Sequence, residues 1–560
     1  MTRSWGTRMG QYDMDRRRFV AALVAGIGGA GIAAACGTST DTAATPSGTD
    51  VTAGGTSSTS ALSTITAAPP PPLTGPAFTL GVASGDPLSD RVILWTRLAP
   101  EPMSLAGAGM PAVDVEVEWE VARDDSFADI VARGVAVATA ALGHSVHVDA
   151  TGLEPDQWYA YRFRLGDEVS PVGRTRTFPA ADSSPERLRL AVANCQDYGS
   201  GRYAAYRDLV THDLDVVLFL GDYIYETPGL EDPTEAIAAR RYAGGFPITV
   251  DDYRRRYAQH HLDPELRAAH QALPWIITFD DHEVINNYAG DDGALAGVGE
   301  EFLVRRAAAY QAWYENLPLR VDPPVDGEIV VHRASSFGDL ARLFVIETRQ
   351  HADPAPCRDT SSFDSGVGCE EQQDETRTAL GAEQERWLID GMAENEAFWQ
   401  LLVNPVLLAG LDISEPDDPP AFYLETWDGY PAERRRIVSA IAERKVRNPV
   451  VLTGDYHASF VADVRPDPFD PASPIVAPEL LATSISSVVF PTDFTATNPQ
   501  VQYFEARNGY LTCEVTRDAI TADFRYVTDV ADAASPVTVG ATFVVMPAAG
   551  DGQAPTITRA

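Results

Sequence analysis

Away from its N-terminus, the 560-residue sequence has no apolar run of the ~20 residues that a membrane-spanning helix needs. Basic residues are also scarce, because 43 Lys and Arg stand against 80 Asp and Glu, for a formal net charge of −37 at pH 7. Phosphate backbones are bound through clustered cations, so this balance excludes a nucleic-acid-binding surface. It leaves open a site in which metal cations screen a group of carboxylates.

The N-terminus has the pattern of an export signal and is set aside from the fold. Arg-Arg-Arg-Phe-Val at 16–20 precedes a Gly- and Ala-rich apolar segment, so that residues 1–35 resemble a twin-arginine (Tat) signal peptide. Cys36 follows Ala-Ala-Ala in a sequence similar to a lipobox, which predicts a lipid anchor; cleavage without a lipid is the alternative. We therefore expect an extracytoplasmic protein, either secreted or anchored to the outer face of the membrane as a lipoprotein.

A linker is predicted after the signal. Residues 36–76 are rich in Thr, Ser, Ala, Gly and Pro and lack the large apolar side chains that offset the entropy of ordering.

Export to an oxidising compartment also permits disulfides among the five cysteines. Cys357 and Cys369 share a loop-like Gly-, Ser- and Asp-rich segment and form the favoured pair, whereas Cys513 fits a buried thiol.

The folded part divides into two predicted domains. Residues 77–182 alternate short apolar-polar strands with turn signals, which is typical of a β-sandwich. Leu153, Pro155 and Tyr159 have the spacing of the tyrosine corner found in fibronectin-type and immunoglobulin-like sandwiches.

From residue 186 onward, short apolar strands alternate with helical segments, which predicts a layered α/β domain over 186–530. Residues 531–560 are expected to be a C-terminal tail. The predicted strands of the α/β domain are 189–193, 216–220, 275–279, 343–346 and 449–453.

Side chains of the kinds that bind metals follow directly on these five strands. The carboxyl ends of strands in an open α/β sheet build the ligand crevice, so the sequence predicts one shared site. Each string alone fits a turn or a helix N-cap, but five together favour a site. The residues at these strand ends are Cys195, Asp222, Tyr225, Asp281, His282, Asn287, Glu347, Arg349, Asp455 and His457.

The residue types at these strand ends suit a multinuclear metal hydrolase. Two cations ~3.5–4 Å apart need a bridging carboxylate, for which Asp222 is placed. Cys195 and Tyr225 are anionic donors suited to a ferric ion, whereas carboxylates and amides such as Asn287 suit Ca²⁺ or Mg²⁺. His282 has the chemistry to protonate a leaving group.

The sequence resembles the alkaline phosphatase D (PhoD-type) family of metallophosphoesterases over nearly all of residues 77–530. The matching segments are GVASGDPLSDRVILWTRL at 81–98, ANCQ at 193–196, GDYIYE at 221–226, DDHEVINN at 280–287, ETRQ at 347–350, WDGYPAER at 427–434 and GDYHASF at 454–460. The resemblance implies a fibronectin- or immunoglobulin-like β-sandwich in front of a metallophosphoesterase αββα sandwich core. It also implies hydrolysis of phosphate esters outside the cytoplasm.

The resemblance further implies the ions and their ligands. Fe³⁺ is expected to be held partly by a cysteine and a tyrosine, with Ca²⁺ completing the site. Carried over to this sequence, the ligands are Cys195, Asp222, Tyr225, Asp281, Asn287, Asp455 and His457. One position departs from the family pattern, because Glu347 stands where an Asp is usual. Its side chain is one methylene longer than that of Asp. It is still expected to bind Ca²⁺, because this ion tolerates irregular geometry of its oxygen ligands. Arg349 is expected either to clamp the substrate phosphate or to form a structural salt bridge.

Three alternatives to a phosphomonoesterase stay open. A phosphodiesterase or phospholipase-D-like enzyme would use the same site on a diester, such as a phospholipid head group. A noncatalytic surface lipoprotein that binds ligands through its sandwich would not need the cluster of carboxylate, His and Cys. A nucleophilic hydrolase based on Cys195 leaves Asp222, Asp281 and Asp455 without a role.

Overall fold

The computed structural model describes residues 67–228, 240–357, 365–394, 396–416, 418–550 and 552–560. The predicted signal segment, Cys36 and most of the predicted linker lie outside these residues. In the part of the chain that is described, no helix has both the length and the apolar character needed to cross a membrane.

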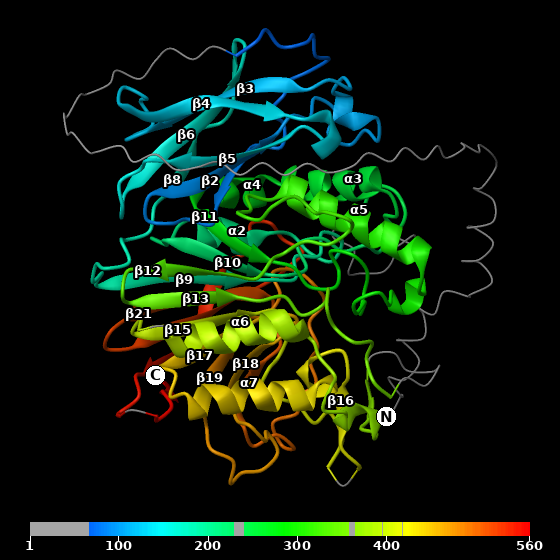
Figure 1. Ribbon diagram of the computed structural model, residues 1–560, viewed down its shortest axis with the longest axis vertical. Coiled ribbons are helices and arrows are strands. Elements are labelled where there is room, and N and C mark those ends of the chain that lie inside the picture. The colour runs from blue at the N-terminus through cyan, green and yellow to red at the C-terminus, as the bar shows by residue number, and fades with distance from the viewer. Residues whose placement is uncertain (1–66, 229–239, 358–364, 395, 417, 551) are drawn as a thin grey trace, which may run out of the picture. The chain divides into compact units, whose positions relative to one another are not determined.

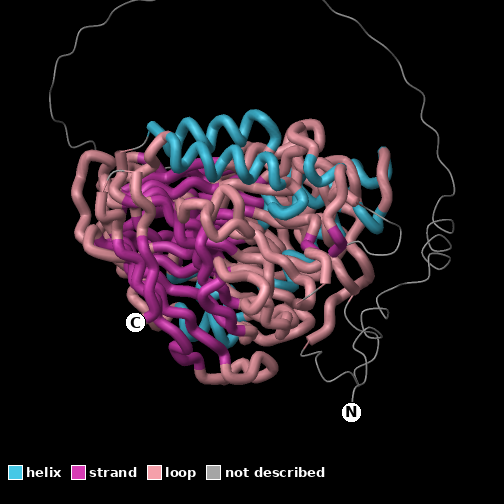
Figure 2. The backbone as a smooth tube through the Cα atoms, turned by 90° about the horizontal axis from the view of Figure 1, so that it is seen from below, coloured by secondary structure: helices cyan, strands magenta, loops and turns pink. Residues whose placement is uncertain are grey.

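Two β-sheets form the centre of the fold (Figures 1 and 2). The larger sheet has the strand order β24-β23-β22-β21-β9-β10-β11-β1-β2-β5, and the smaller has the order β12-β13-β15-β17-β19-β18-β20. The strands of the larger sheet are β1 (Val82–Gly85), β2 (Arg91–Arg97), β5 (Ser145–Thr151), β9 (Arg187–Ala193), β10 (Val216–Leu220), β11 (Pro274–Thr278), β21 (Gly509–Thr516), β22 (Ile520–Val527), β23 (Val537–Met546) and β24 (Thr556–Arg559). Those of the smaller sheet are β12 (Arg333–Phe337), β13 (Ala341–Val345), β15 (Trp399–Asn404), β17 (Pro449–Thr453), β18 (Ser459–Val464), β19 (Ala477–Leu481) and β20 (Val501–Glu505).

Strands β9, β10 and β11 are parallel neighbours whose side chains alternate between two separate cores. On β10, Leu218 and Leu220 face the core between the two sheets, whereas Val217 and Phe219 face the core under the helices. A strand covered on both faces is apolar along its whole length, which explains why these segments carry no polar alternation. All five residues of β10 are buried.

Helices cover the outer face of each sheet. The larger sheet packs against α2 (Ala204–Leu209), α3 (Val250–His261), α4 (Pro264–Ala272) and α5 (Glu300–Asn316). The smaller sheet packs against α6 (Gly381–Glu394) and α7 (Pro431–Glu443). Two sheets face to face between two layers of helices make an αββα sandwich, the core fold that the sequence predicted.

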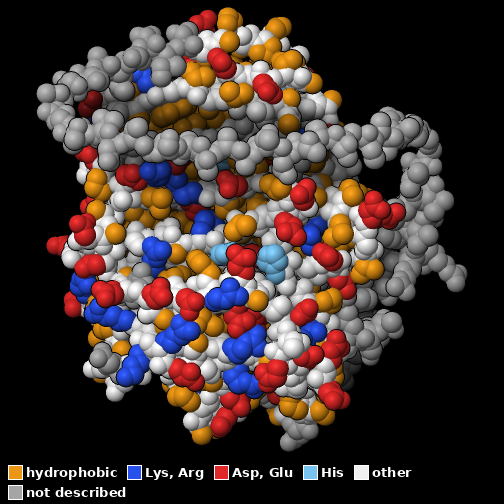
Figure 3. Space-filling model, viewed as in Figure 1, with side chains coloured by type: hydrophobic (Ala, Val, Ile, Leu, Met, Phe, Trp, Pro, Cys, Tyr) orange, Lys and Arg blue, Asp and Glu red, His pale blue; other side chains and the backbone are white. Residues whose placement is uncertain are grey.

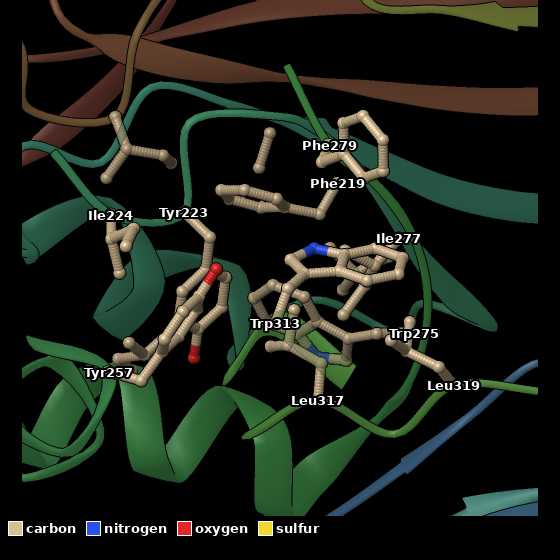
Figure 4. Packing of buried hydrophobic residues seen from close by; sticks show 14 of the residues in the cluster. Phe219, Tyr223, Ile224, Tyr257, Trp275, Ile277, Phe279, Trp313, Leu317 and Leu319 are labelled. Atoms are coloured by element: carbon tan, nitrogen blue, oxygen red, sulfur yellow. The ribbon is translucent and has the colours of Figure 1, made fainter. Parts of the chain in front are cut away.

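Aromatic side chains fill the core between the larger sheet and its helices (Figure 4). Phe219 of β10 stacks on Trp275 of β11 with ring centroids 5.7 Å apart. Phe279, just after β11, meets the edge of Trp313 from α5 at 5.3 Å. Offset and edge-on pairs of this kind add stabilisation beyond the burial of apolar area. They fix the end of β11 against α5 immediately before the residues of the predicted site.

The N-terminal β-sandwich is present and shares a sheet with the core. Its second sheet consists of β3 (Val115–Ala122), β4 (Ile130–Ala138), β6 (Trp158–Leu165), β7 (Glu168–Val169) and β8 (Gly173–Arg176), which pack on β1, β2 and β5. The backbone N–H of Glu154 donates to the Tyr159 hydroxyl at 2.9 Å, as the tyrosine-corner spacing indicated. Strand β1 pairs in parallel with β11 of the core, so no break in the sheet separates residues 77–182 from 186–530.

The C-terminal segment is not a tail. Residues 537–546 and 556–559 form β23 and β24, which extend the larger sheet beyond β22. The prediction of a tail over 531–560 is wrong because Ala541, Phe543 and Val545 alternate with partly buried residues and are themselves buried in the core between the sheets.

The cysteines lie in two settings. Cys357 and Cys369, the pair favoured from the sequence, are joined in a disulfide with a Cα–Cα distance of 5.8 Å. Cys195 and Cys513 are buried free thiols, and Cys513 lies on β21. The strand β14 (Ser365–Val367), which precedes Cys369 in the sequence, pairs with β16 (Ala421–Tyr423) in a short two-stranded sheet.

Surface charges of both signs are interspersed on the face of the molecule shown in Figure 3. Arg436 of α7 forms an ion pair of 2.8 Å with Glu385 of α6. Each such surface ion pair contributes little to the stability of the fold.

Asp86 links the N-terminal strands to the core through hydrogen bonds and an ion pair. The residue is 2% exposed and has a left-handed backbone with φ of 44°. Its carboxylate accepts the backbone N–H of Arg320 at 2.7 Å and the Nε–H of Arg333 at 2.9 Å. The sequence therefore places a buried ion pair where the chain turns between β1 and β2.

We predict that Asp86→Ala lowers the free energy of unfolding by about 3 kcal/mol, because it leaves the Arg333 guanidinium without its buried counter-charge. Denaturant unfolding followed by circular dichroism measures this change. Asp90→Ala is the matched control: Asp90 pairs with Arg91 on the surface, with 54% of its side chain exposed, and its loss is expected to cost less than about 1 kcal/mol. Equal losses in the two variants would contradict the role given to Asp86.

Candidate metal centre

The predicted site residues meet where the parallel strands of both sheets end. Cys195 follows β9, Asp222 and Tyr225 follow β10, and Asp281 and His282 follow β11. His457 follows β17 of the smaller sheet, yet its Nε2 lies 3.0 Å from the hydroxyl of Tyr225. The carboxyl ends of the two sheets therefore build one site between them.

Two groups of metal-type ligand atoms overlap at Asp222. One group comprises Cys195, Asp222 and His457, and the other comprises Asp222, Asp281 and His282. Within each group the ligand atoms lie within 4.8 Å of one another. Because Asp222 belongs to both groups, it is in the position that a carboxylate bridging two ions requires.

Tyr225 closes the first group. Its hydroxyl donates to Asp222 Oδ2 at 2.9 Å. The same oxygen lies 3.0 Å from His457 Nε2 and 2.8 Å from the hydroxyl of Ser487. Tyr225 is 6% exposed, and burial together with the charges of Asp222 and Cys195 raises the pKa of its phenol. A cation beside the Tyr225 oxygen would offset these effects.

The ring of His457 is oriented for ligation. Its Nδ1 contacts the carbonyl oxygen of Val488 at 2.7 Å, which places the proton on Nδ1 and leaves Nε2 as an acceptor toward the site. Burial lowers the pKa of His457 to about 4, so the imidazole is neutral at physiological pH. A neutral, oriented imidazole is the form that binds a metal ion.

Unpaired buried charge shows that these residues fit a metal centre. Asp222 is 1% exposed, and its Oδ1 has no hydrogen-bond partner among the described residues. Burial, and then the carboxylates of Asp281 and Asp280, raise its pKa well above the usual value despite the opposing charge of His282. The thiol of Cys195 is raised in pKa by burial, Asp222 and Asp455 in the same way. One or more cations among these groups remove the penalty for each of them.

Backbone strain is concentrated on the same residues. Left-handed backbone conformations are uncommon outside glycine and cost about 1–3 kcal/mol each, and they cluster at functional sites. Five of the predicted ligands have positive φ angles: Cys195 (53°), Asp222 (59°), Asn287 (56°), Asp455 (69°) and His457 (58°). Left-handed turns therefore follow β9, β10 and β17 at predicted ligands.

His282 belongs to the second group, and a buried carboxylate orients its ring. Its Nδ1 contacts Glu226 Oε2 at 2.7 Å, and its ring packs on that of Tyr225 with centroids 4.1 Å apart. Burial opposes the charged form of His282, but Glu226, Asp281 and Asp222 outweigh it and raise the pKa well above the usual value. The charges around the ring thus favour the imidazolium form of His282.

Asp280 and Asp281 are divided between two roles. Asp281 joins the ligand group with Asp222 and accepts the backbone N–H of Asn287 at 2.6 Å. Asp280 instead forms a buried, two-point ion pair with Arg349, whose Nη2 lies 3.2 Å from Asp280 Oδ2. The third guanidinium nitrogen of Arg349 donates to the Glu425 carbonyl at 3.3 Å. These contacts favour the salt bridge over the phosphate clamp for Arg349.

Glu347 and Asp455 are two further carboxylates among the predicted ligands. Glu347 is buried but belongs to neither ligand group of the described residues, and its Oε2 accepts the backbone N–H groups of Arg349 and Gln350 at 2.8 and 2.9 Å. The carboxylate of Glu347 thus folds back onto its own turn. Asp455 is also outside both groups, and its carbonyl lies 3.8 Å from the Cys195 sulfur.

Three supporting residues were not predicted from the sequence. Glu226 orients His282, and Ser487 contacts the oxygen of Tyr225. Glu283 accepts the backbone N–H groups of Asp222, Tyr223 and Asp280 at 3.1, 2.6 and 3.0 Å and so ties the loops after β10 and β11 together. Glu226 and Glu283 stand inside the GDYIYE and DDHE segments, which gave a signal; Ser487 stands in no segment that the sequence singled out.

Comparisons with known proteins identify the family of this chain. The family model of the PhoD-like phosphatase matches residues 190–524, and that of the PhoD-like phosphatase N-terminal domain matches residues 64–179. The chain is 42% identical over 475 residues to alkaline phosphatase D of Bacillus subtilis (strain 168), covering 83% of this chain and 80% of that protein. A solved structure of PhoD matches with a TM-score of 0.82 at 40% identity, over 87% of this chain and 93% of that one. The chain therefore belongs to the PhoD-like phosphatase family and is a phosphate-ester hydrolase.

Proposed function

We propose that the protein is an extracytoplasmic, metal-dependent phosphoesterase that hydrolyses phosphate esters with metal-activated water. The observation that carries the proposal is the position of Asp222, which belongs to both ligand groups and keeps one buried carboxylate oxygen without a partner. A binding protein without catalysis has no need of this strained, charged cluster.

Fe³⁺ and Ca²⁺ are the ions that we propose for the centre. Cys195, Tyr225 and His457 would hold Fe³⁺ together with one oxygen of Asp222, because thiolate, phenolate and imidazole suit a ferric ion. The other oxygen of Asp222, with Asp281, Asn287 and Asp455, offers the hard oxygen donors that suit Ca²⁺. When bound, these ions supply the activation of water and the neutralisation of charge on the phosphate.

The chain's own residues supply proton transfer and positioning. Glu226 holds Nδ1 of His282, which shares a ligand group with Asp222 and Asp281. From there His282 can protonate the leaving oxygen of the ester, which is the role that a positioned imidazolium fills in general acid catalysis. Arg349 acts on the site through Asp280, whose carboxylate it holds beside Asp281.

A diester substrate is the second candidate, and one surface feature favours it. Phe490 stacks on His457 with ring centroids 5.0 Å apart, yet 40% of the residue is exposed. Val488, next to it, is 48% exposed. Apolar side chains that stay in solvent beside a catalytic site suit the second organic arm of a phosphodiester or a phospholipid head group.

We predict that pure protein prepared without chelators is coloured, because a phenolate bound to Fe³⁺ absorbs visible light by charge transfer. Tyr225→Phe should bleach or shift this band and reduce activity roughly tenfold, while retaining the oxygen-ligated ions. Asp222→Asn should lower hydrolysis by roughly 10²-fold or more, because it removes the charge that both ions share. Visible spectra, elemental analysis and steady-state rates measure these effects. A colourless, fully active wild-type enzyme that contains only Zn²⁺ or Mn²⁺ would refute iron and spare the phosphoesterase.

Removal of the metals should abolish hydrolysis of both ester classes together, because the same ions act on either. We predict that exhaustive treatment with a chelator stops turnover of p-nitrophenyl phosphate and of bis(p-nitrophenyl) phosphate, and that readdition of Fe³⁺ and Ca²⁺ restores both. Phe490→Ala should raise KM for the diester severalfold and leave KM for the monoester unchanged. Equal effects on the two substrates would remove the support that Phe490 gives to a diesterase.

Export by the Tat route is a separate proposal, since its residues lie outside the described part of the chain. We predict that replacing Arg16 and Arg17 with Lys keeps the precursor inside the cell, measured by fractionation and immunoblotting. Cys36→Ala should move exported protein from the membrane fraction to the medium if Cys36 carries a lipid. Normal export of the Lys variant would overturn the Tat proposal, and an unchanged distribution of Cys36→Ala would favour release by simple cleavage.

A further inference from the structure

The loop that follows β19 contacts three of the proposed iron ligands from outside the metal centre. The backbone N–H of Ser487 donates to the carbonyl of Cys195 at 3.3 Å. The carbonyl of Val488 contacts Nδ1 of His457, and the hydroxyl of Ser487 contacts the oxygen of Tyr225. One loop thus reaches the residues that follow β9, β10 and β17, which come from different parts of the sequence.

Ser487 stands at the centre of these contacts. It is 2% exposed, and its Oγ lies 2.8 Å from the Tyr225 oxygen and 2.8 Å from the Cys195 carbonyl oxygen. Its Oγ also accepts the backbone N–H of Asp197 at 3.2 Å. A serine hydroxyl has a single proton, so Tyr225 and Cys195 compete for one hydrogen bond.

The competition has a definite outcome when Tyr225 ligates a cation. A phenolate oxygen is charged and is therefore a stronger acceptor than an amide carbonyl. The other described partners of the Tyr225 oxygen are Asp222 and His457, which are themselves proposed ligands. Ser487 is the described partner whose hydrogen bond to Tyr225 can persist beside the bound ion.

We propose that Ser487 is a positioning residue of the metal centre: its hydroxyl donates to the Tyr225 oxygen, fixes its direction toward the iron, and slows loss of the metal. This inference rests on the metal centre proposed above and concerns a residue that does not itself ligate. Hydrogen bonds to ligand atoms from outside the coordination sphere typically change metal affinity or activity by about 10–100-fold.

Ser486 offers a matched control on the same loop. It is 1% exposed, and its hydroxyl donates to the Asp197 carbonyl at 2.8 Å. Ser486→Ala therefore removes one buried hydroxyl hydrogen bond from the same loop without touching Tyr225. Any general effect of weakening the loop appears in both variants, whereas an effect on Tyr225 appears only in Ser487→Ala.

The test compares wild-type protein, Ser487→Ala and Ser486→Ala, each purified as the full chain without chelators. We expect Ser487→Ala to lose iron to EDTA at least about tenfold faster than the other two proteins. Its charge-transfer band should lie at longer wavelength, since a phenolate without a donated hydrogen bond gives up electron density more readily. Elemental analysis over time and visible spectra provide both readouts, and neither depends on turnover.

Each outcome decides between the two proposals. Metal-loaded wild-type protein with Ser487→Ala and Ser486→Ala indistinguishable in release rate and band position would overturn the role of Ser487 alone. If the wild-type protein holds a metal other than iron, the charge-transfer band is absent. The rates at which the three proteins release that metal to EDTA then provide the test. Wild-type protein that holds no metal would overturn the metal centre and, with it, this inference.

A measurement on the wild type covers the case in which Ser487→Ala fails to fold. In the resonance Raman spectrum of the coloured protein, exchange of H₂O for D₂O should shift the C–O stretching frequency of the tyrosinate, because an exchangeable proton is donated to its oxygen. An unchanged frequency in D₂O would contradict the hydrogen bond on which the proposal depends.

Discussion

The crowding of buried anionic groups around Asp222 is the constraint on which the rest of the structure depends. Asp222 and Asp281 are almost fully buried within one ligand group, with the Cys195 thiol in the neighbouring group. Repulsion between like charges is strong at such depth and is only partly offset by His282 and by Arg349, which is committed to Asp280. Cations would relieve this repulsion, and the strained left-handed turns persist because the surrounding sheets hold them.

The fold meets this constraint by bringing two parallel sets of strand ends together. Strands β9, β10 and β11 direct their ends to one side, and β17 contributes His457 from the facing sheet. Glu283 binds three backbone N–H groups of the loops after β10 and β11, and burial raises its pKa to about 8 even so. The buried apolar cores on both faces of β10 hold this edge of the sheet in place.

Local patterns predicted a layered α/β domain and the residues at the strand ends, whereas the αββα core was implied by the resemblance of the sequence to the PhoD-type family. A short apolar strand followed by Gly-Asp or Asp-Asp-His can be recognised within ten residues. The partners of those residues cannot. Spacing does not tell which of Asp280 and Asp281 joins the ligand group with Asp222. It also allowed two roles for Arg349, a phosphate clamp or a salt bridge, and the structure shows the salt bridge, with Asp280. The supposed tail over 531–560 was wrong for a related reason: it pairs with β22, and its alternation has meaning only against that neighbour.

The residues that the sequence did not reveal share one property, which is that they act through a contact far along the chain. Glu226 pairs with His282 across 56 residues, and Ser487 with Tyr225 across 262. The position of Ser487 follows from the order β17-β19-β18 in the smaller sheet, which does not follow chain order. Since β19 lies beside β17, the loop after β19 emerges next to His457, and a serine there reaches ligands from both sheets. Ligands are thus encoded locally, at strand ends, whereas the groups that orient them are encoded by strand order.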